Sequence, residues 1–283
     1  MKIIKSLGEL SDKYQDFIFD QFGVLHSGLE AYPGVVQALK ENKDRGKRNI
    51  ILSNSTRTAE HNFASMEKNQ KIPKDLFAGM VTSGDFFISR IREVYPDLKS
   101  MKSFVVARDD DYFNKYGIDI SYTDKPAAAD LILFMGMKDV QKPLSYYEGI
   151  LAEAAAKKIP SVCANPDLQM ISEGIVRPGV GSVAAIYEKL GGSVLYMGKP
   201  HVPIYEFLFK RFSIKPENAV ALGDSPLHDL RGANNFGFDS VFVLTGIHED
   251  QLTADDDAEL MSKYEKFRVE YPDRPTYLMR KLK

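Results

Sequence analysis

Short apolar runs that end in polar residues recur along the chain, and segments with helical periodicity lie between them. The first run, Phe-Ile-Phe at 17–19, ends at Asp20, and later runs end at Ser53, Lys199 and Asp224. Regular alternation of short strands and helices is typical of α/β proteins. The pattern therefore predicts a doubly wound, mostly parallel sheet that helices cover on both faces.

Four polar side chains occur where predicted strands end, namely those of Asp20, Ser53, Lys199 and Asp224. Each of them alone has an ordinary structural explanation, such as a surface lysine or a helix N-cap. In open parallel sheets, however, ligands bind at the carboxyl ends of the strands. We therefore expect the four side chains to lie at one edge of the sheet, within about 10 Å of one another.

These residue types together indicate phosphate chemistry. The carboxylates of Asp20 and Asp224 are hard oxygen ligands, which suit Mg²⁺. Lys199 is a compact cation suited to phosphate oxygens, and Ser53 and Asn54 precede a predicted helix whose first N–H groups can bind an anion. Asp20 could then act as a nucleophile that forms an aspartyl-phosphate, while Mg²⁺ and Lys199 neutralise negative charge.

Four pieces of the sequence, in this order, resemble the motifs of the haloacid dehalogenase (HAD) superfamily. They are Phe19–Leu25, Leu52–Ser55, Gly198–Pro200 and Gly223–Asp229, and they span nearly the whole chain. The Ser-Asn-Ser form of the second motif, the Gly-Lys-Pro and the Asn-Pro-Asp at 165–167 are similar to the NagD-like branch, class IIA. This resemblance implies a Mg²⁺-dependent hydrolase, usually a phosphatase, with a HAD-like Rossmannoid core.

The resemblance also implies a role for each matching residue. Asp20 is the nucleophile, Ser53 binds the transferring phosphoryl group, and Lys199 stabilises its charge. The implied Mg²⁺ ligands are Asp20, the carbonyl of Phe22, Asp224 and Asp229. The implied substrate-binding residues are Ser53, Asn54, Ser55, Asn165, Asp167 and Lys199.

In the NagD-like branch an α/β cap domain is inserted between the second and third motifs. The resemblance therefore implies a core domain formed by residues 1–84 and 181–283, and a cap domain formed by residues 85–180. Proteins of this branch often associate through their caps, so we expect a homodimer. No motif in the cap range identifies the substrate beyond a small phosphorylated metabolite, with sugar phosphates among the candidates.

One position departs from the superfamily pattern. HAD phosphatases carry an Asp two residues after the nucleophile, and it serves as general acid and base; here that residue is Phe22. General acid–base help is typically worth about 10²–10⁴-fold in rate. Because histidine titrates near neutral pH, His26, His201 or His228 could replace the missing group, although each alone is explained as a structural or exposed residue.

The substitution leaves three interpretations. The first is a phosphatase of low activity with a substituted or absent acid/base group. The second is a phosphate-ligand binding or regulatory protein with little turnover. The third is a dehalogenase-like HAD hydrolase, in which an aromatic residue at this position is familiar. A dehalogenase needs no metal ion, however, whereas the arrangement around Asp224 and Asp229 suits a metal ion.

Composition narrows the class of protein. The net charge of the 283 residues is −2, which argues against nucleic acid as a partner. Cys163 is the one cysteine, which excludes an intrachain disulfide and a cysteine-rich metal site. The sequence has no apolar run of about 18 residues and no signal-peptide core, so we expect a cytoplasmic protein without a membrane partner. We expect the acidic run 249–259 to be a loop or a solvated face.

Overall fold

The computed structural model describes residues 1–106, 111–137, 142–172 and 175–282. The chain divides into two compact units. The first consists of Met1–Ser53, Ala59–Val81 and Lys199–Lys283, and the second consists of Asn54–Thr58 and Thr82–Gly198.

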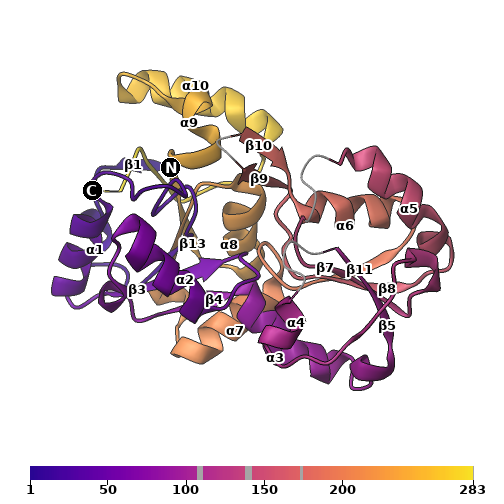
Figure 1. Ribbon diagram of the computed structural model, residues 1–283. Helices are drawn as coiled ribbons and strands as arrows, with labels where there is room; N and C mark the ends of the chain where they lie inside the picture. Colours follow the sequence, from indigo (N-terminus) through magenta and orange to yellow (C-terminus); the bar gives the residue numbers. More distant parts are fainter. Residues whose placement is uncertain (107–110, 138–141, 173–174, 283) are drawn as a thin grey trace. The chain divides into compact units, whose positions relative to one another are not determined.

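A seven-stranded sheet forms the centre of the first unit, with the order β1-β14-β13-β12-β2-β3-β4. The pairings of β1 with β14, β14 with β13, β13 with β12, β12 with β2, and β2 with β3 are all parallel. N-terminal (indigo) and C-terminal (orange to yellow) segments share this sheet (Figure 1). The strands are β1 (Lys2–Ile4), β2 (Asp16–Phe19), β3 (Arg48–Ser53), β4 (Gly79–Thr82), β12 (Ala219–Gly223), β13 (Asp239–Val243) and β14 (Tyr277–Met279).

Helices cover both faces of this sheet. Successive strand side chains point to opposite faces, and β13 shows the consequence. Val241 and Val243 belong to the apolar cluster that includes Leu39 of α1, whereas Phe242 belongs to the cluster that includes Leu260 of α10. The predicted doubly wound α/β fold is therefore confirmed. The helices of this unit are α1 (Val35–Asp44), α2 (Ala59–Ser65), α7 (Val202–Phe212), α8 (Arg231–Phe236), α9 (Glu249–Leu252) and α10 (Asp257–Glu270).

The second unit has its own five-stranded sheet, with the order β11-β8-β7-β5-β6, in which every pairing is parallel. An antiparallel pair, β9 with β10, lies outside that sheet. The strands are β5 (Lys102–Val106), β6 (Ser121–Tyr122), β7 (Leu131–Phe134), β8 (Pro160–Cys163), β9 (Gln169–Ser172), β10 (Ile175–Pro178) and β11 (Ser193–Tyr196). The helices are α3 (Ser83–Val94), α4 (Tyr112–Lys115), α5 (Leu144–Ala156) and α6 (Val180–Lys189).

The second unit extends beyond the range 85–180 that the sequence suggests for a cap. It includes α6 and β11, because β11 pairs in parallel with β8 from Ser193 opposite Pro160 to Tyr196 opposite Cys163. It also includes the short segment Asn54–Thr58. Within the cap range, residues 107–110, 138–141 and 173–174 lie outside the described part of the chain.

The acidic run 249–259 is the expected solvated face, since most of its side chains are exposed, and it is helical over most of its length. It forms α9 and the first turn of α10. Asp256 caps α10, since its side chain accepts a hydrogen bond from the N–H of Glu259. Among the described residues, none of the helices has the length and apolar character needed to cross a membrane.

The buried side chain of Asn49 forms hydrogen bonds to other segments of the first unit, and substituting it tests this packing. The amide of Asn49 on β3 donates to the carbonyl oxygens of Leu39 and Leu76, both at 2.9 Å, and accepts from Asn42 at 2.8 Å. We expect Asn49→Ala to lower the free energy of unfolding by about 3 kcal/mol, because it leaves buried carbonyls without a donor. Urea unfolding checks this. Asn69→Ala, at an exposed position, serves as the control and should change the free energy of unfolding by less than about 0.5 kcal/mol. Equal effects of the two substitutions would contradict the stabilising role of the Asn49 hydrogen bonds.

Candidate active site

Three predicted site residues start from adjacent strand ends of the first unit. Asp20 directly follows β2, Ser53 is the last residue of β3, and Asp224 directly follows β12. β2 lies between β12 and β3 and pairs in parallel with both. The N–H of Asp20 continues the ladder by donating to the carbonyl oxygen of Leu222 at 2.8 Å. The three side chains therefore leave the sheet at one edge.

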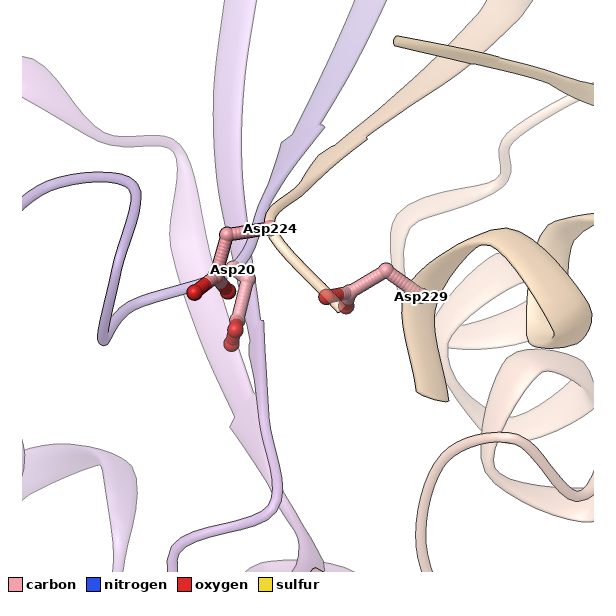
Figure 2. Close-up of side chains that lie close together, drawn as sticks. All are labelled: Asp20, Asp224 and Asp229. Carbon is pink, nitrogen blue, oxygen red and sulfur yellow. The ribbon is translucent and has the colours of Figure 1, made fainter. Parts of the chain in front are cut away.

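Three carboxylates converge at this edge. Oxygen atoms of Asp20, Asp224 and Asp229 all lie within 4.8 Å of one another. Figure 2 shows the three side chains directed toward a common point. Asp229 comes from the π-helical turn Pro226–Leu230 that follows β12, and its side chain, like that of Asp224, is buried. The sequence separates Asp20 from the other two by about 200 residues, and the strand order removes that separation.

Lys199 joins two of these carboxylates. Its ammonium nitrogen lies 2.7 Å from Oδ1 of Asp20 and 2.7 Å from Oδ1 of Asp229. Burial lowers the pKa of Lys199, but the negative charges of the two carboxylates outweigh that effect and hold its pKa above the usual value. Lys199 is therefore a fixed cation at neutral pH, as a charge-stabilising role requires.

The carboxylate of Asp224 fills a space that two glycines leave open. A Cβ atom on Gly23 would lie 2.0 Å from Oδ2 of Asp224, and one on Gly246 would lie 1.9 Å from it. Gly23 also has a φ of +81°, which favours glycine. The N–H of Ile247 donates to the same oxygen at 3.1 Å. Burial, together with the charges of Asp20 and Asp229, raises the pKa of Asp224 well above its usual value.

The donor set fits a divalent cation. Lys199 supplies one positive charge against the three negative charges of Asp20, Asp224 and Asp229. Burying carboxylates next to one another is costly unless a cation compensates them. Carboxylate oxygens are the ligands that hard divalent cations such as Mg²⁺ prefer. The cluster is therefore suited to hold such an ion beside Lys199.

Phe22 occupies the position of the expected acid/base group and presents an aromatic ring instead. The side chain is half-exposed. Its ring centroid lies 4.6 Å from that of His26, edge to face. The ring also covers Gly28, where a Cβ atom would lie 2.8 Å from it. Packing on both neighbours holds the ring in place.

His26 does not fit the role of substitute acid. Its Nδ1 accepts a hydrogen bond from the N–H of Gly28 at 3.0 Å, so the neutral ring carries its proton on Nε2. Nε2 lies 3.2 Å from the side-chain amide of Gln21. We assign the amide oxygen to that position, which also gives Gln21 Oε1 the partner that it otherwise lacks. Burial lowers the pKa of His26 to about 4, so the ring is neutral at pH 7.

The other two histidines remain candidates. His201 directly precedes α7, and its side chain is half-buried. His228 is also half-buried, and its Nδ1 lies 2.8 Å from the hydroxyl of Ser225.

The remaining predicted substrate-binding residues belong to the second unit, and three of the four contact one another. Nδ2 of Asn54 donates to Oδ1 of Asp167 at 2.8 Å, and the N–H of Asp167 donates to Oδ1 of Asn165 at 2.9 Å. The carbonyl oxygen of Ser55 accepts from the N–H of Gly84 at 3.0 Å. The structure therefore gathers Asn54, Asn165 and Asp167 in one network.

Two contributors to these networks are absent from the predicted site. Ser83 donates to Oδ1 of Asn54 at 3.3 Å, and the polar run Thr-Ser-Gly at the end of β4 was a signal for it. The loop of Gly246 and Ile247 encloses Asp224, and the Thr-Gly that ends the β13 run was a signal there. Both belong to the pattern of polar residues at strand ends.

The chain is similar in sequence to families of known proteins. Residues 17–119 match the haloacid dehalogenase-like hydrolase family, and residues 196–282 match a HAD-hydrolase-like family. The chain is 24% identical over 257 residues to human chronophin, covering 86% of this chain and 85% of that protein. It is 22% identical over 286 residues to the 4-nitrophenylphosphatase of Schizosaccharomyces pombe, covering 92% and 93%.

A solved structure agrees along the whole chain. A haloacid dehalogenase-like hydrolase from Brucella suis superposes with a TM-score of 0.82 at 25% identity, covering 99% of this chain and 100% of that one. The chain belongs to the haloacid dehalogenase-like hydrolases. Within that family it is similar to NagD and to the 4-nitrophenylphosphatases. The predicted family is confirmed, and this HAD-like hydrolase is an enzyme.

A substitution at Asp224 tests the cation site. We expect Asp224→Asn to abolish Mg²⁺ binding measured by calorimetry, because it removes a charged ligand. The same change should raise the free energy of unfolding of the metal-free protein by at least about 1 kcal/mol, because it relieves repulsion among buried carboxylates.

Asp239→Asn is the matched control. Asp239 begins β13 at the opposite edge of the sheet and accepts from Lys13 and Tyr14. We expect this variant to lose stability and to bind Mg²⁺ like the native protein. Unchanged Mg²⁺ binding in Asp224→Asn would show that the cluster is not the cation site.

Proposed function

We propose that this HAD-like hydrolase is a Mg²⁺-dependent phosphatase that acts on a small phosphorylated metabolite through an aspartyl-phosphate on Asp20. The observation that carries the proposal is the Lys199 ammonium, held at 2.7 Å from both Asp20 and Asp229 inside a carboxylate cluster. The name of the Schizosaccharomyces pombe relative, a 4-nitrophenylphosphatase, supports the reaction class. In this proposal the first unit is the catalytic core and the second unit is the cap.

In the first half-reaction, Asp20 attacks the phosphorus atom of the substrate. A bond forms between an Asp20 oxygen and phosphorus, and the bond from phosphorus to the leaving oxygen breaks. Oδ1 of Asp20 accepts from Lys199 and from the N–H of Gln21, both at 2.7 Å. These two contacts fix the rotation of the carboxylate, and Ser53 donates to an oxygen of the transferring group.

In the second half-reaction, a bond forms between the oxygen of a water molecule and phosphorus, and the bond from phosphorus to the Asp20 oxygen breaks. Asp20 is regenerated as a carboxylate, and the protons of the water leave with inorganic phosphate. Lys199 keeps its proton throughout, because the adjacent carboxylates hold its pKa above the usual value. A bound Mg²⁺ would neutralise charge on Asp20 and the phosphoryl oxygens. Its proposed ligands are Asp20, Asp224 and the carbonyl of Phe22, with Asp229 supporting the site.

The aromatic ring of Phe22 shapes the choice of substrate. It supplies no proton to the leaving oxygen. The rate of hydrolysis should therefore fall least for substrates whose leaving groups are stable anions, such as aryl or acyl phosphates. Alkyl phosphates, which include sugar phosphates, lose most of the 10²–10⁴-fold that proton transfer typically gives. Water also lacks a base in the second half-reaction. We therefore expect low turnover and accumulation of the aspartyl-phosphate.

Restoring a carboxylate at position 22 tests this proposal. We expect Phe22→Asp to raise kcat/KM for an alkyl phosphate by at least about 10-fold more than for an aryl phosphate, because only the poor leaving group needs protonation. Phe22→Asn, which removes the ring but adds no titratable group, is the control and should not show this difference. Steady-state kinetics with Mg²⁺ measures both.

A native protein that hydrolyses sugar phosphates at ordinary enzyme rates would contradict the missing-acid premise. His201→Ala and His228→Ala would then identify the substitute. The variant that loses rate for alkyl phosphates but not for aryl phosphates would mark the acid.

A second function follows from the same ring. Without an acid/base group, the protein could bind a phosphorylated ligand for regulation and turn it over slowly. A panel of phosphorylated metabolites, assayed with Mg²⁺ beside Asp20→Asn, separates the two functions. Turnover that the variant abolishes supports the phosphatase, whereas binding without turnover in the native protein supports the regulatory function. The carboxylate cluster argues against a dehalogenase, which needs no metal.

We also propose that the protein is a cytoplasmic homodimer that associates through the second unit. This proposal rests on the resemblance to the NagD-like branch. We expect sedimentation equilibrium to give twice the chain mass of 31.8 kDa. A monomer at high protein concentration would overturn it.

A further inference from the structure

One buried polar network lies next to both proposed phosphate-binding residues. The chain passes from the first unit to the second after Ser53 and returns to the first unit at Lys199. The adjoining residues of the second unit are Asn54 and Gly198. A Cβ atom on Gly198 would lie 2.6 Å from Oδ1 of Asn54, so the side chain of Asn54 packs directly against the backbone of Gly198.

Ser83 closes this network from a third segment. Its hydroxyl donates to Oδ1 of Asn54 at 3.3 Å, and a Cβ atom on Gly198 would lie 2.6 Å from that hydroxyl. Ser83 is the first residue of α3, and it directly follows β4. Three segments that are distant in sequence therefore meet at the side chain of Asn54.

Asp167 completes the network from the loop after β8. Its Oδ1 accepts from Nδ2 of Asn54 at 2.8 Å, and its own N–H donates to Asn165. Asn54 is 3% exposed and Ser83 is fully buried. Hydrogen bonds of buried polar groups are strong and rigidify their surroundings, because water does not compete with them. Both the oxygen and the nitrogen of the Asn54 amide are therefore held.

We propose that Asn54, Ser83 and Asp167 are positioning residues that set the spacing between Ser53 and Lys199. The network fixes the side chain of Asn54 against the backbone of Gly198. Because each is peptide-bonded to a proposed phosphate-binding residue, it also fixes where Ser53 and Lys199 begin. This inference deepens the proposed phosphatase function and rests on it. It gives Asn54 and Asp167 a role through their contacts with one another instead of through contact with substrate.

A charge swap tests the hydrogen bond between positions 54 and 167. In Asn54→Asp two carboxylates oppose each other in a partly buried place, so we expect kcat to fall by at least about 100-fold, a loss of roughly 2.7 kcal/mol. Asp167→Asn keeps an acceptor for Nδ2 of Asn54, so its kcat should fall by less than about 5-fold.

The double variant Asn54→Asp/Asp167→Asn restores the network with its polarity reversed. The carboxylate introduced at 54 accepts both from Ser83 and from the amide introduced at 167. We expect kcat to return to within about 10-fold of the native value. If the Asn54 amide instead acts by touching the substrate, the double variant stays as impaired as Asn54→Asp, and that result would overturn the proposal.

A matched pair of serine variants separates positioning from stability. Ser83→Ala removes one buried hydroxyl from the network. Ser161→Ala removes one from β8, where the hydroxyl donates to the carbonyl oxygen of Ser193 at 2.9 Å. We expect both to lower Tm by similar amounts and only Ser83→Ala to lower kcat, by about 10-fold. If Ser83→Ala and Ser161→Ala lower kcat equally, the network stabilises the fold and does not position Ser53 and Lys199. This pair also decides the question if Asn54→Asp does not fold.

Calorimetry that measures the binding of inorganic phosphate in the presence of Mg²⁺ distinguishes a failure of the positioning role from a failure of the phosphatase proposal. If the native protein hydrolyses no phosphate ester but binds inorganic phosphate, the phosphatase proposal fails. The inference then still predicts weaker phosphate binding in Asn54→Asp and recovery in the double variant. If the native protein turns over and the double variant does not recover, the inference alone fails. A native protein that neither turns over nor binds phosphate overturns both.

Discussion

The concentration of negative charge at one strand edge is the constraint on which the rest of the site depends. Asp20, Asp224 and Asp229 lie within 4.8 Å of one another, and two of them are buried. Such a cluster is stable only where cations and donors surround it. Lys199 bridges two carboxylates, the N–H of Ile247 reaches the third, and Gly23 leaves the space that the third occupies.

Much of this arrangement could be predicted from the sequence because it depends on local patterns. Apolar runs that end at Asp20, Ser53 and Asp224 predict parallel strands whose polar ends share one edge of the sheet, and the structure has this arrangement. The resemblance to HAD motifs added Asp229, whose short helical turn carries no strand pattern of its own. The spacing of apolar residues thus predicts the strands of the sheet, and the HAD motifs predict which residues lie at its edge.

Other features depend on contacts between distant segments, which no local pattern reveals. Residues 193–196 have the pattern of a strand, but only the pairing of β11 with β8 assigns them to the second unit. His26 has the sequence context of a possible acid, yet its burial lowers its pKa to about 4. The sequence predicts a loop or a solvated face for the acidic run 249–259, and the structure makes it a solvated face that is largely helical. In each case the three-dimensional surroundings decide the outcome.

The contact between Phe22 and Gly28 has a consequence for how this site could change over time. Gly28 has a φ of +101°, and a Cβ atom there would lie 2.8 Å from the ring of Phe22. A side chain at position 28 would therefore meet both an unfavourable backbone and the aromatic ring. The two positions are mutually dependent. Exchanging the half-exposed ring for a carboxylate would expose the glycine to solvent, and replacing the glycine first would displace the ring. The identity of residue 22 is thus coupled to that of residue 28.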